Sequence, residues 1–228
     1  MNKNIKLTLI LCLLFVAFVF VMTYFRITSN NAATLSPEAL REAGALVYEE
    51  PVVLAPFSLL DHRGNAFTQD KLVGKWSLIF FGFTSCPDIC PLTLTELSQF
   101  YQHLKVATPG DETQIIMVSV DPQRDTTEKM AEYMSSFHED FVGLNGPYED
   151  VASLARQLFI AHEPPPPVVQ VPNDPHAGHV MSAPTDYEID HSGNILIINP
   201  DGRYHGFFDA AIQDRELTLA YQSIRSDY

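Results

Sequence analysis

The sequence predicts an α/β domain with a mixed central sheet and helices on both faces, preceded by one N-terminal transmembrane helix. Three features of the 228 residues support this fold class. Apolar runs of strand length alternate with stretches of helical periodicity, as in sheets covered by helices. A Pro-Asp-Gly turn near the C-terminus predicts an antiparallel hairpin. A 19-residue apolar stretch near the N-terminus is long enough to cross a bilayer.

The apolar stretch, Leu7–Phe25, is interrupted only by two threonines, with two lysines before it and Arg26 after it. This short positive flank predicts a cytoplasmic N-terminus and an exported domain. A cleaved signal peptide would have a shorter apolar core and a small-residue cleavage site, and neither is present here. A lipid anchor on Cys12 is disfavoured because Cys12 lies deep in the run. We therefore expect an uncleaved anchor over 1–28.

The amino-acid composition excludes several classes of protein. The formal net charge is −14, and the part after Arg26 holds 11 basic and 28 acidic residues, a net charge of −17. This acidity argues against a nucleic-acid binder, which needs a basic surface. Three cysteines are too few for a disulfide-dense scaffold or a four-cysteine zinc site.

The first elements follow from local patterns. Residues 29–50 are polar and charged, which predicts a tether with one helical turn before a domain over 51–228. Two short strands flank a glycine-containing turn within 57–68. The continuous apolar run 76–83 is expected to form a central strand covered on both faces. In 91–105, apolar residues recur every three or four positions, which predicts an amphipathic helix.

The second half continues the alternation. Residues 114–120 form another apolar run of strand length, and Asp125-Thr-Thr-Glu128 has the pattern of a capping box for a helix to about 137. The segment 163–185 carries seven of the sixteen prolines, so we expect a long loop insertion. The other expected elements are a strand at 141–144, a helix at 148–160, a hairpin at 194–208 around Pro200-Asp-Gly202 and a helix at 212–224.

Cys86 and Cys90 stand where the predicted central strand ends and the next helix begins. Unpaired N–H groups and the dipole at a helix N-terminus favour a thiolate. A spacing of four residues places both sulfurs on one helical face, where they could bind one metal ion or form a disulfide. A structural disulfide or two inert core cysteines are the simpler alternatives. The adjacent prolines indicate an exposed turn and favour a functional dithiol.

Two thiolates leave a metal ion under-coordinated. Thiolate suits Cu(I), zinc and iron–sulfur centres, and a third ligand would have to be histidine or methionine. Of the eight histidines, His191 stands out because its loop immediately precedes a buried hairpin strand and can lie beside the helix start. The proline-rich loop adds His176, His179 and Met181, which are either part of an exposed loop or a weak second copper site.

Four motifs together resemble the Sco/SenC family. They are Cys86-Pro-x-x-Cys90-Pro after Phe-x-Phe-Thr, Val118-Ser-Val-Asp-Pro-x-Arg-Asp125-Thr, Asp190-His-Ser and Asn199-Pro-Asp-Gly, and the resemblance covers about residues 50–226. It implies a thioredoxin-like fold with an added hairpin, and copper, as Cu(I) or Cu(II), bound by Cys86, Cys90 and His191. It also implies a copper chaperone that assembles the CuA centre of cytochrome c oxidase subunit II.

Alternative functions use the same dithiol. A thiol–disulfide oxidoreductase could reduce the CuA-site cysteines, which leaves open whether the protein is an enzyme, and a copper or redox sensor is a further alternative. A peroxiredoxin-type peroxidase is disfavoured because Thr84-Ser-Cys86 is one residue short of the required spacing. Expected partners are subunit II, a thioredoxin-like reductant and other periplasmic copper carriers. The expected location is the inner (cytoplasmic) membrane, with a single span and the soluble domain in the periplasm.

The motif containing Asp121, Arg124 and Asp125 has two interpretations. It is either a strand-end turn in which Asp125 caps the following helix, or a docking surface near the dithiol.

Overall fold

The central feature of the computed structural model is one eight-stranded sheet in the order β1-β8-β7-β4-β5-β6-β2-β3. The structure describes residues 11–23, 35–161, 193–210 and 212–228. The strands are β1 (Ala45–Val53), β2 (Ser58–Asp61), β3 (Ala66–Thr68), β4 (Ser77–Gly82), β5 (Gln114–Ser119), β6 (Val142–Asn145), β7 (Ile195–Ile198) and β8 (Arg203–Phe208). The helices are α2 (Pro37–Glu42), η1 (Gln69–Leu72), α3 (Ile89–Ala107), α4 (Thr127–Ser135), α5 (Tyr148–Gln157) and α6 (Asp214–Asp227).

The sheet is mixed, as predicted. Strands β4, β5 and β6 run parallel, whereas β7 lies antiparallel to β4 and forms a hairpin with β8. The second hairpin, β2–β3, extends the other edge by pairing with β6. The first two parallel strands are joined through α3, because parallel neighbours require a crossover. The β4 strand is buried at all six positions, which matches the apolar run that predicted it.

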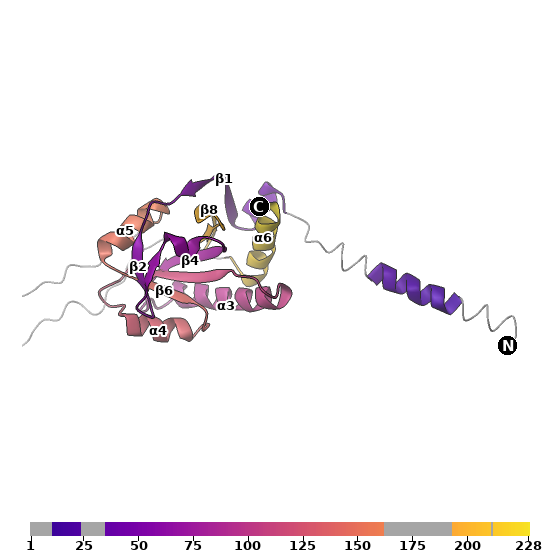
Figure 1. Cartoon of the computed structure of the whole chain (residues 1–228), viewed down its shortest axis with the longest axis horizontal. Coiled ribbons are helices and arrows are strands. Elements are labelled where there is room, and N and C mark those ends of the chain that lie inside the picture. The colour runs from indigo at the N-terminus through magenta and orange to yellow at the C-terminus, as the bar shows by residue number, and fades with distance from the viewer. Residues whose placement is uncertain (1–10, 24–34, 162–192, 211) are drawn as a thin grey trace, which may run out of the picture.

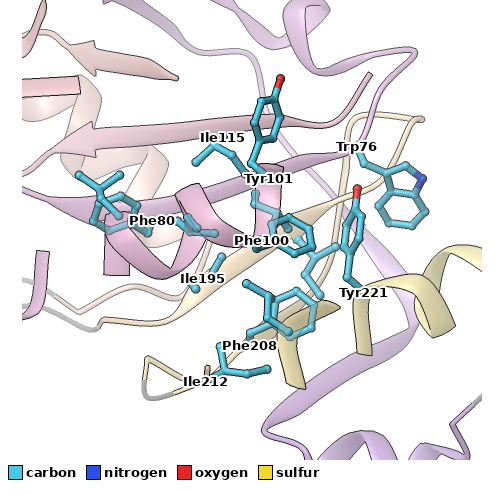
Figure 2. Close-up of a cluster of buried hydrophobic side chains, with 14 of the residues drawn as sticks. Trp76, Phe80, Phe100, Tyr101, Ile115, Ile195, Phe208, Ile212 and Tyr221 are labelled. Atoms are coloured by element: carbon cyan, nitrogen blue, oxygen red, sulfur yellow. The ribbon is translucent and has the colours of Figure 1, made fainter. Parts of the chain in front are cut away.

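Two hydrophobic clusters fill the two faces of the sheet. One lies under α3, α4 and α6 and contains aromatic residues from the helices and the sheet (Figure 2). Phe100 of α3 packs edge-on against Tyr221 of α6, with ring centroids 5.1 Å apart. The other cluster lies under α5, on the opposite face from α3 (Figure 1). Cys86 packs against both clusters, so it stands where the two cores meet.

Strand β1 is an element that the sequence patterns did not predict. We expected a tether over 29–50, but Leu40 of α2 is buried and β1 pairs with β8 from Ala45 onward. The strand is half exposed and its register shifts between Val47 and Val52, around two glutamates and a proline. Charged residues and proline are typical of edge strands, and they hide the alternation that identifies an inner strand.

The N-terminal part of the structure contains a helix over 11–23. None of the helices in the described ranges combines the length and the apolar character that a bilayer span requires. The predicted span, Leu7–Phe25, extends beyond the described residues at both ends, and the predicted loop 163–185 lies outside them.

Candidate dithiol and metal centre

The two cysteines flank the start of α3. The helix begins at Ile89 with Asp88 as its N-cap, so Cys90 lies in the first turn and Cys86 in the preceding loop. The prediction that both sulfurs share one helical face was therefore wrong. Pro87 explains the difference, because a residue before proline is disfavoured in the helical conformation. The backbone N–H of Cys86 instead donates to the Phe83 carbonyl, 3.1 Å away.

The Cys90 sulfur is enclosed by the end of β4. Its residue is 1% exposed, and a side-chain carbon at Gly82 would come within 2.8 Å of its Sγ. The absence of a side chain at Gly82 thus makes room for the sulfur. The backbone N–H of Phe83 hydrogen-bonds this sulfur, and the Cys86 side chain is within hydrogen-bonding distance of it. The two thiols are therefore neighbours, and neither forms a disulfide.

Burial decides the protonation of Cys90. Loss of solvent raises the pKa of the Cys90 thiol, and the hydrogen bond from Phe83 lowers it by less. The neighbouring Cys86 and Asp125 raise it further. The helix N-terminus was expected to favour a thiolate here, but desolvation outweighs that effect.

A buried carboxylate braces the loop that carries Cys86. The Asp125 side chain accepts hydrogen bonds from the backbone N–H of Thr84, at 3.1 and 3.2 Å, and from the Thr84 hydroxyl at 2.5 Å. It also accepts from the Ser119 hydroxyl at 2.6 Å. Burial raises the pKa of Asp125, while the bonds from Ser119 and Thr84 lower it and nearby Asp121 raises it. The carboxylate thus ties the ends of β4 and β5 together beside the dithiol.

Asp125 is not the helix cap that the sequence suggested. The N-cap of α4 is Thr126, whose hydroxyl accepts a hydrogen bond from the backbone N–H of Lys129. Threonine and aspartate are both good N-caps, so two adjacent candidates leave the boundary ambiguous by one residue. Because Thr126 caps the helix, the Asp125 side chain can instead bond Thr84 and Ser119 inside the fold.

The first half of the same motif also packs inside the fold. Asp121 is fully buried and forms an ion pair with Arg124, while its backbone N–H donates to the Ser119 hydroxyl at 3.0 Å. The Arg124 guanidinium lies over the Phe83 ring, 5.5 Å from its centroid. Both carboxylates therefore have partners inside the fold: Arg124 for Asp121, and the ends of β4 and β5 for Asp125.

We expect Asp125→Ala to lower the free energy of unfolding by about 3 kcal/mol, because three buried donors lose their acceptor. Urea denaturation of the variant and the unchanged chain measures this loss. Asp88→Ala is the matched control, since Asp88 is exposed and its side chain makes no capping bond. A loss at Asp125 no larger than at Asp88 would contradict the bracing role.

Three contributors to the site's surroundings were missed by sequence reasoning: Thr84, Ser119 and Tyr133. Thr84 and Ser119 are the donors to Asp125. Tyr133 of α4 packs against the cluster that contains Cys90, and its hydroxyl is buried without a hydrogen-bond partner in the described structure. Thr84 and Ser119 lie within the sequence motifs, but their role as donors to Asp125 appears only in the fold, and no motif marks Tyr133.

Histidines in the described ranges are engaged away from the dithiol. His62 bonds Gly143, His103 contacts Asp214, His138 contacts Asp140, and His205 packs against Trp76. In those ranges, no group of three histidine, cysteine or acidic side chains could hold a metal ion. The remaining predicted ligands, His176, His179, Met181 and His191, lie outside the described residues.

The fold and the site define a class of protein: a thioredoxin-like domain with a dithiol at the start of the helix that follows the central strand. Comparison with known sequences identifies the family within this class. A family model described as SCO1/SenC matches residues 47–225. A relative from Stutzerimonas stutzeri is 31% identical over 189 residues, covering 80% of this chain and 84% of that protein. The chain belongs to the SCO1/SenC family.

Two further relatives place the chain within this family. The human protein SCO1 homolog, mitochondrial, is 32% identical over 182 residues, which cover 80% of this chain and 54% of that protein. The chain thus corresponds to little more than half of the human relative. The crystal structure of yeast Sco1 with copper bound is 30% identical and covers 78% of this chain and 91% of that chain, with a TM-score of 0.66.

Proposed function

We propose that this protein is a membrane-anchored copper chaperone that delivers copper to the CuA centre of cytochrome c oxidase subunit II. The observation that carries the proposal is the pair of neighbouring reduced thiols, Cys86 and Cys90, at the start of α3. Two thiolates are ligands that copper prefers, and they suit Cu(I) in particular. The family relationship supports the same cargo, since the yeast relative was solved with copper bound.

We assign the third copper ligand to His191. A side chain at Gly193 would lie 3.5 Å from Cγ1 of Ile89, the residue before Cys90. His191 stands two residues before Gly193, and two residues of extended chain span at most about 7 Å, which supports His191 as the ligand. The four described histidines are engaged elsewhere in the fold, which leaves the segment before Gly193 as the source of an imidazole ligand.

Copper is the cargo, and the chain's own residues control its capture and release. Copper binding requires thiolates, so the proton held by buried Cys90 leaves as the metal enters. Asp125 fixes the loop of Cys86 through Thr84, which keeps one sulfur half exposed toward an acceptor. Copper passes to the acceptor by exchange of ligands. A protein disulfide of the oxidising compartment can then take two electrons and two protons from the empty dithiol, which becomes a disulfide, and a thioredoxin-like reductant returns them.

The loop residues His176, His179 and Met181 form a proposed second, weaker copper site that receives metal from other periplasmic carriers. Imidazole and thioether groups both bind copper. Such a site would raise the local supply of copper before transfer to the dithiol.

We infer that Leu7–Phe25 anchors the chain in the inner membrane with the domain in the periplasm. The apolar side chains of 11–23 are exposed in the structure, among them Leu13 and Phe20 at 70% and 73%. An exposed apolar surface of this kind fits insertion into lipid. The domain would then operate where thiols are oxidised, which gives the dithiol a need for a reductant.

Thiol–disulfide exchange with the CuA-site cysteines is the second candidate function. The same contact between Cys86 and Cys90 that suits copper also suits a reversible disulfide. Copper binding needs a third ligand, whereas exchange does not, so His191 separates the two functions.

Anaerobic copper titration of the reduced chain, followed by mixing with the copper-free CuA domain, tests the proposal. We expect one tightly bound copper per dithiol and movement of metal to the acceptor. Reduction of the acceptor's disulfide without metal transfer would favour the oxidoreductase instead. His191→Ala should bind Cu(II) poorly while retaining disulfide exchange, and His103→Ala is the matched control because His103 contacts Asp214 on the surface.

A further inference from the structure

Tyr133 places a polar group in an unfavourable position beside the dithiol. Its hydroxyl is shielded from solvent and has no hydrogen-bond partner in the part of the chain that the structure describes. A buried hydroxyl without a partner costs about 1–3 kcal/mol, so native structures contain few of them. This hydroxyl thus carries a cost that a change of state at the site could remove.

The ring of Tyr133 is held in place by packing. It lies edge-on to Phe137, with ring centroids 5.2 Å apart, and packs against the cluster that contains Cys90. The hydroxyl interacts with the surrounding charges: burial raises the pKa of Tyr133 most, followed by Cys90, Cys86 and Asp125. The hydroxyl is therefore within electrostatic range of both sulfurs, although it hydrogen-bonds neither of them in the described structure.

The nearby acceptors among the described residues leave this hydroxyl without a partner. The oxygens of Asp125 already accept from Thr84 and Ser119. A neutral thiol is only a weak acceptor, whereas a thiolate is a strong one. The state of the site that supplies an acceptor is the one in which a sulfur has lost its proton, as it does when it binds a metal.

We propose that Tyr133 donates a hydrogen bond to the Cys90 thiolate when copper is bound, and that it is a positioning residue which favours the loaded state. This inference rests on the proposed function. On this proposal, the hydroxyl has opposite effects in the two states: it destabilises the protein without copper and stabilises the copper complex. A residue with a merely structural role would contribute to both states with the same sign.

Tyr133→Phe tests this claim because it removes only the hydroxyl. In the reduced, copper-free full-length chain in detergent, we expect an unchanged or higher midpoint of thermal unfolding. We expect the Cu(I) affinity, measured by competition with a chromophoric chelator, to fall about tenfold. The thiolate-to-Cu(II) charge-transfer band should move to longer wavelength, because the sulfur loses a hydrogen bond that stabilises its lone pairs.

Tyr101→Phe is the matched control. Tyr101 lies on α3, and its hydroxyl donates to Asp140 at 3.2 Å, so its loss should lower the thermal midpoint and leave copper binding unchanged. If Tyr133→Phe lowers the thermal midpoint in the same way and leaves affinity and spectrum unchanged, Tyr133 has no role toward copper. If the unchanged chain binds no copper, both the proposed function and this inference are wrong. If the unchanged chain binds copper and Tyr133→Phe binds it equally well, only this inference is wrong.

Discussion

Cys90→Ser is expected to abolish stable copper binding while the fold is retained. Cys90 is 1% exposed and enclosed by Gly82 and Phe83, and serine is the substitution that fits this space with the least change. A serine hydroxyl is a poor ligand for Cu(I), and the remaining Cys86 thiolate and the proposed His191 imidazole cannot complete the site. Changes to groups that only support metal ligands cost about 10–100-fold in affinity, so loss of a ligand should exceed about 100-fold. Anaerobic competition titration measures the loss.

Cys12→Ser is the control for this experiment, because Cys12 lies in the N-terminal helix over 11–23 and is exposed there. It should bind copper as the unchanged chain does. Cys86→Ser should match Cys90→Ser in copper binding but cost less stability, since Cys86 is half exposed. Retention of the full copper affinity by Cys90→Ser would show that the dithiol is not the metal site, and the sensor and oxidoreductase functions would then become the stronger candidates.

The inner part of the sheet could be predicted because its strands are buried on both faces. Strands β4 and β5 are continuous apolar runs, and a run of that length between turn residues is enough to identify a central parallel strand. The hairpin β7–β8 was marked by its Pro-Asp-Gly turn. At these positions the local pattern and the tertiary environment agree.

The outer part of the sheet could not be predicted in the same way. Strand β1 carries glutamates and a proline, and it becomes a strand because β8 offers an unpaired edge. That partner lies about 160 residues away in sequence, so no local window contains the cause. The start of α4 illustrates a smaller ambiguity, in which Asp125 and Thr126 are both good N-caps and tertiary contacts with Thr84 decide between them.

The candidate site, too, could be predicted from the sequence only in part. The dithiol could be found because two cysteines, two prolines and a strand-to-helix boundary coincide within a few residues. The protonation of Cys90 could not, because the helix dipole is a local effect and the opposing burial is not. Tyr133 lies more than forty residues from either cysteine, and a tyrosine on an amphipathic helix is ordinarily a core residue.

Gly206→Ala is expected to produce the largest loss of stability, because Gly206 faces the backbone of β1. A side-chain carbon there would lie 2.1 Å from the carbonyl oxygen of Leu46 and 2.9 Å from the Cα of Val47, and the φ of Gly206 is +154°. Backbone atoms cannot rotate away as a side-chain tip can, so β1 must shift along β8. We expect the free energy of unfolding to fall by about 3 kcal/mol or more, measured by urea denaturation.

Gly110→Ala separates the two causes of this loss, which are the steric clash with β1 and the backbone strain at a positive φ. Gly110 also has a positive φ, +88°, but an added carbon there meets no atom within 4 Å, so the variant reports conformational strain of about 1–2 kcal/mol without a clash. If Gly206→Ala lowers the free energy of unfolding no more than Gly110→Ala does, β1 accommodates the added carbon at little cost. The expected larger loss should appear first as faster amide exchange in β1. Because β8 and β7 separate β1 from β4, copper binding at the end of β4 should survive in the folded molecules. The edge strand would then contribute to stability, whereas the dithiol depends on the inner strands.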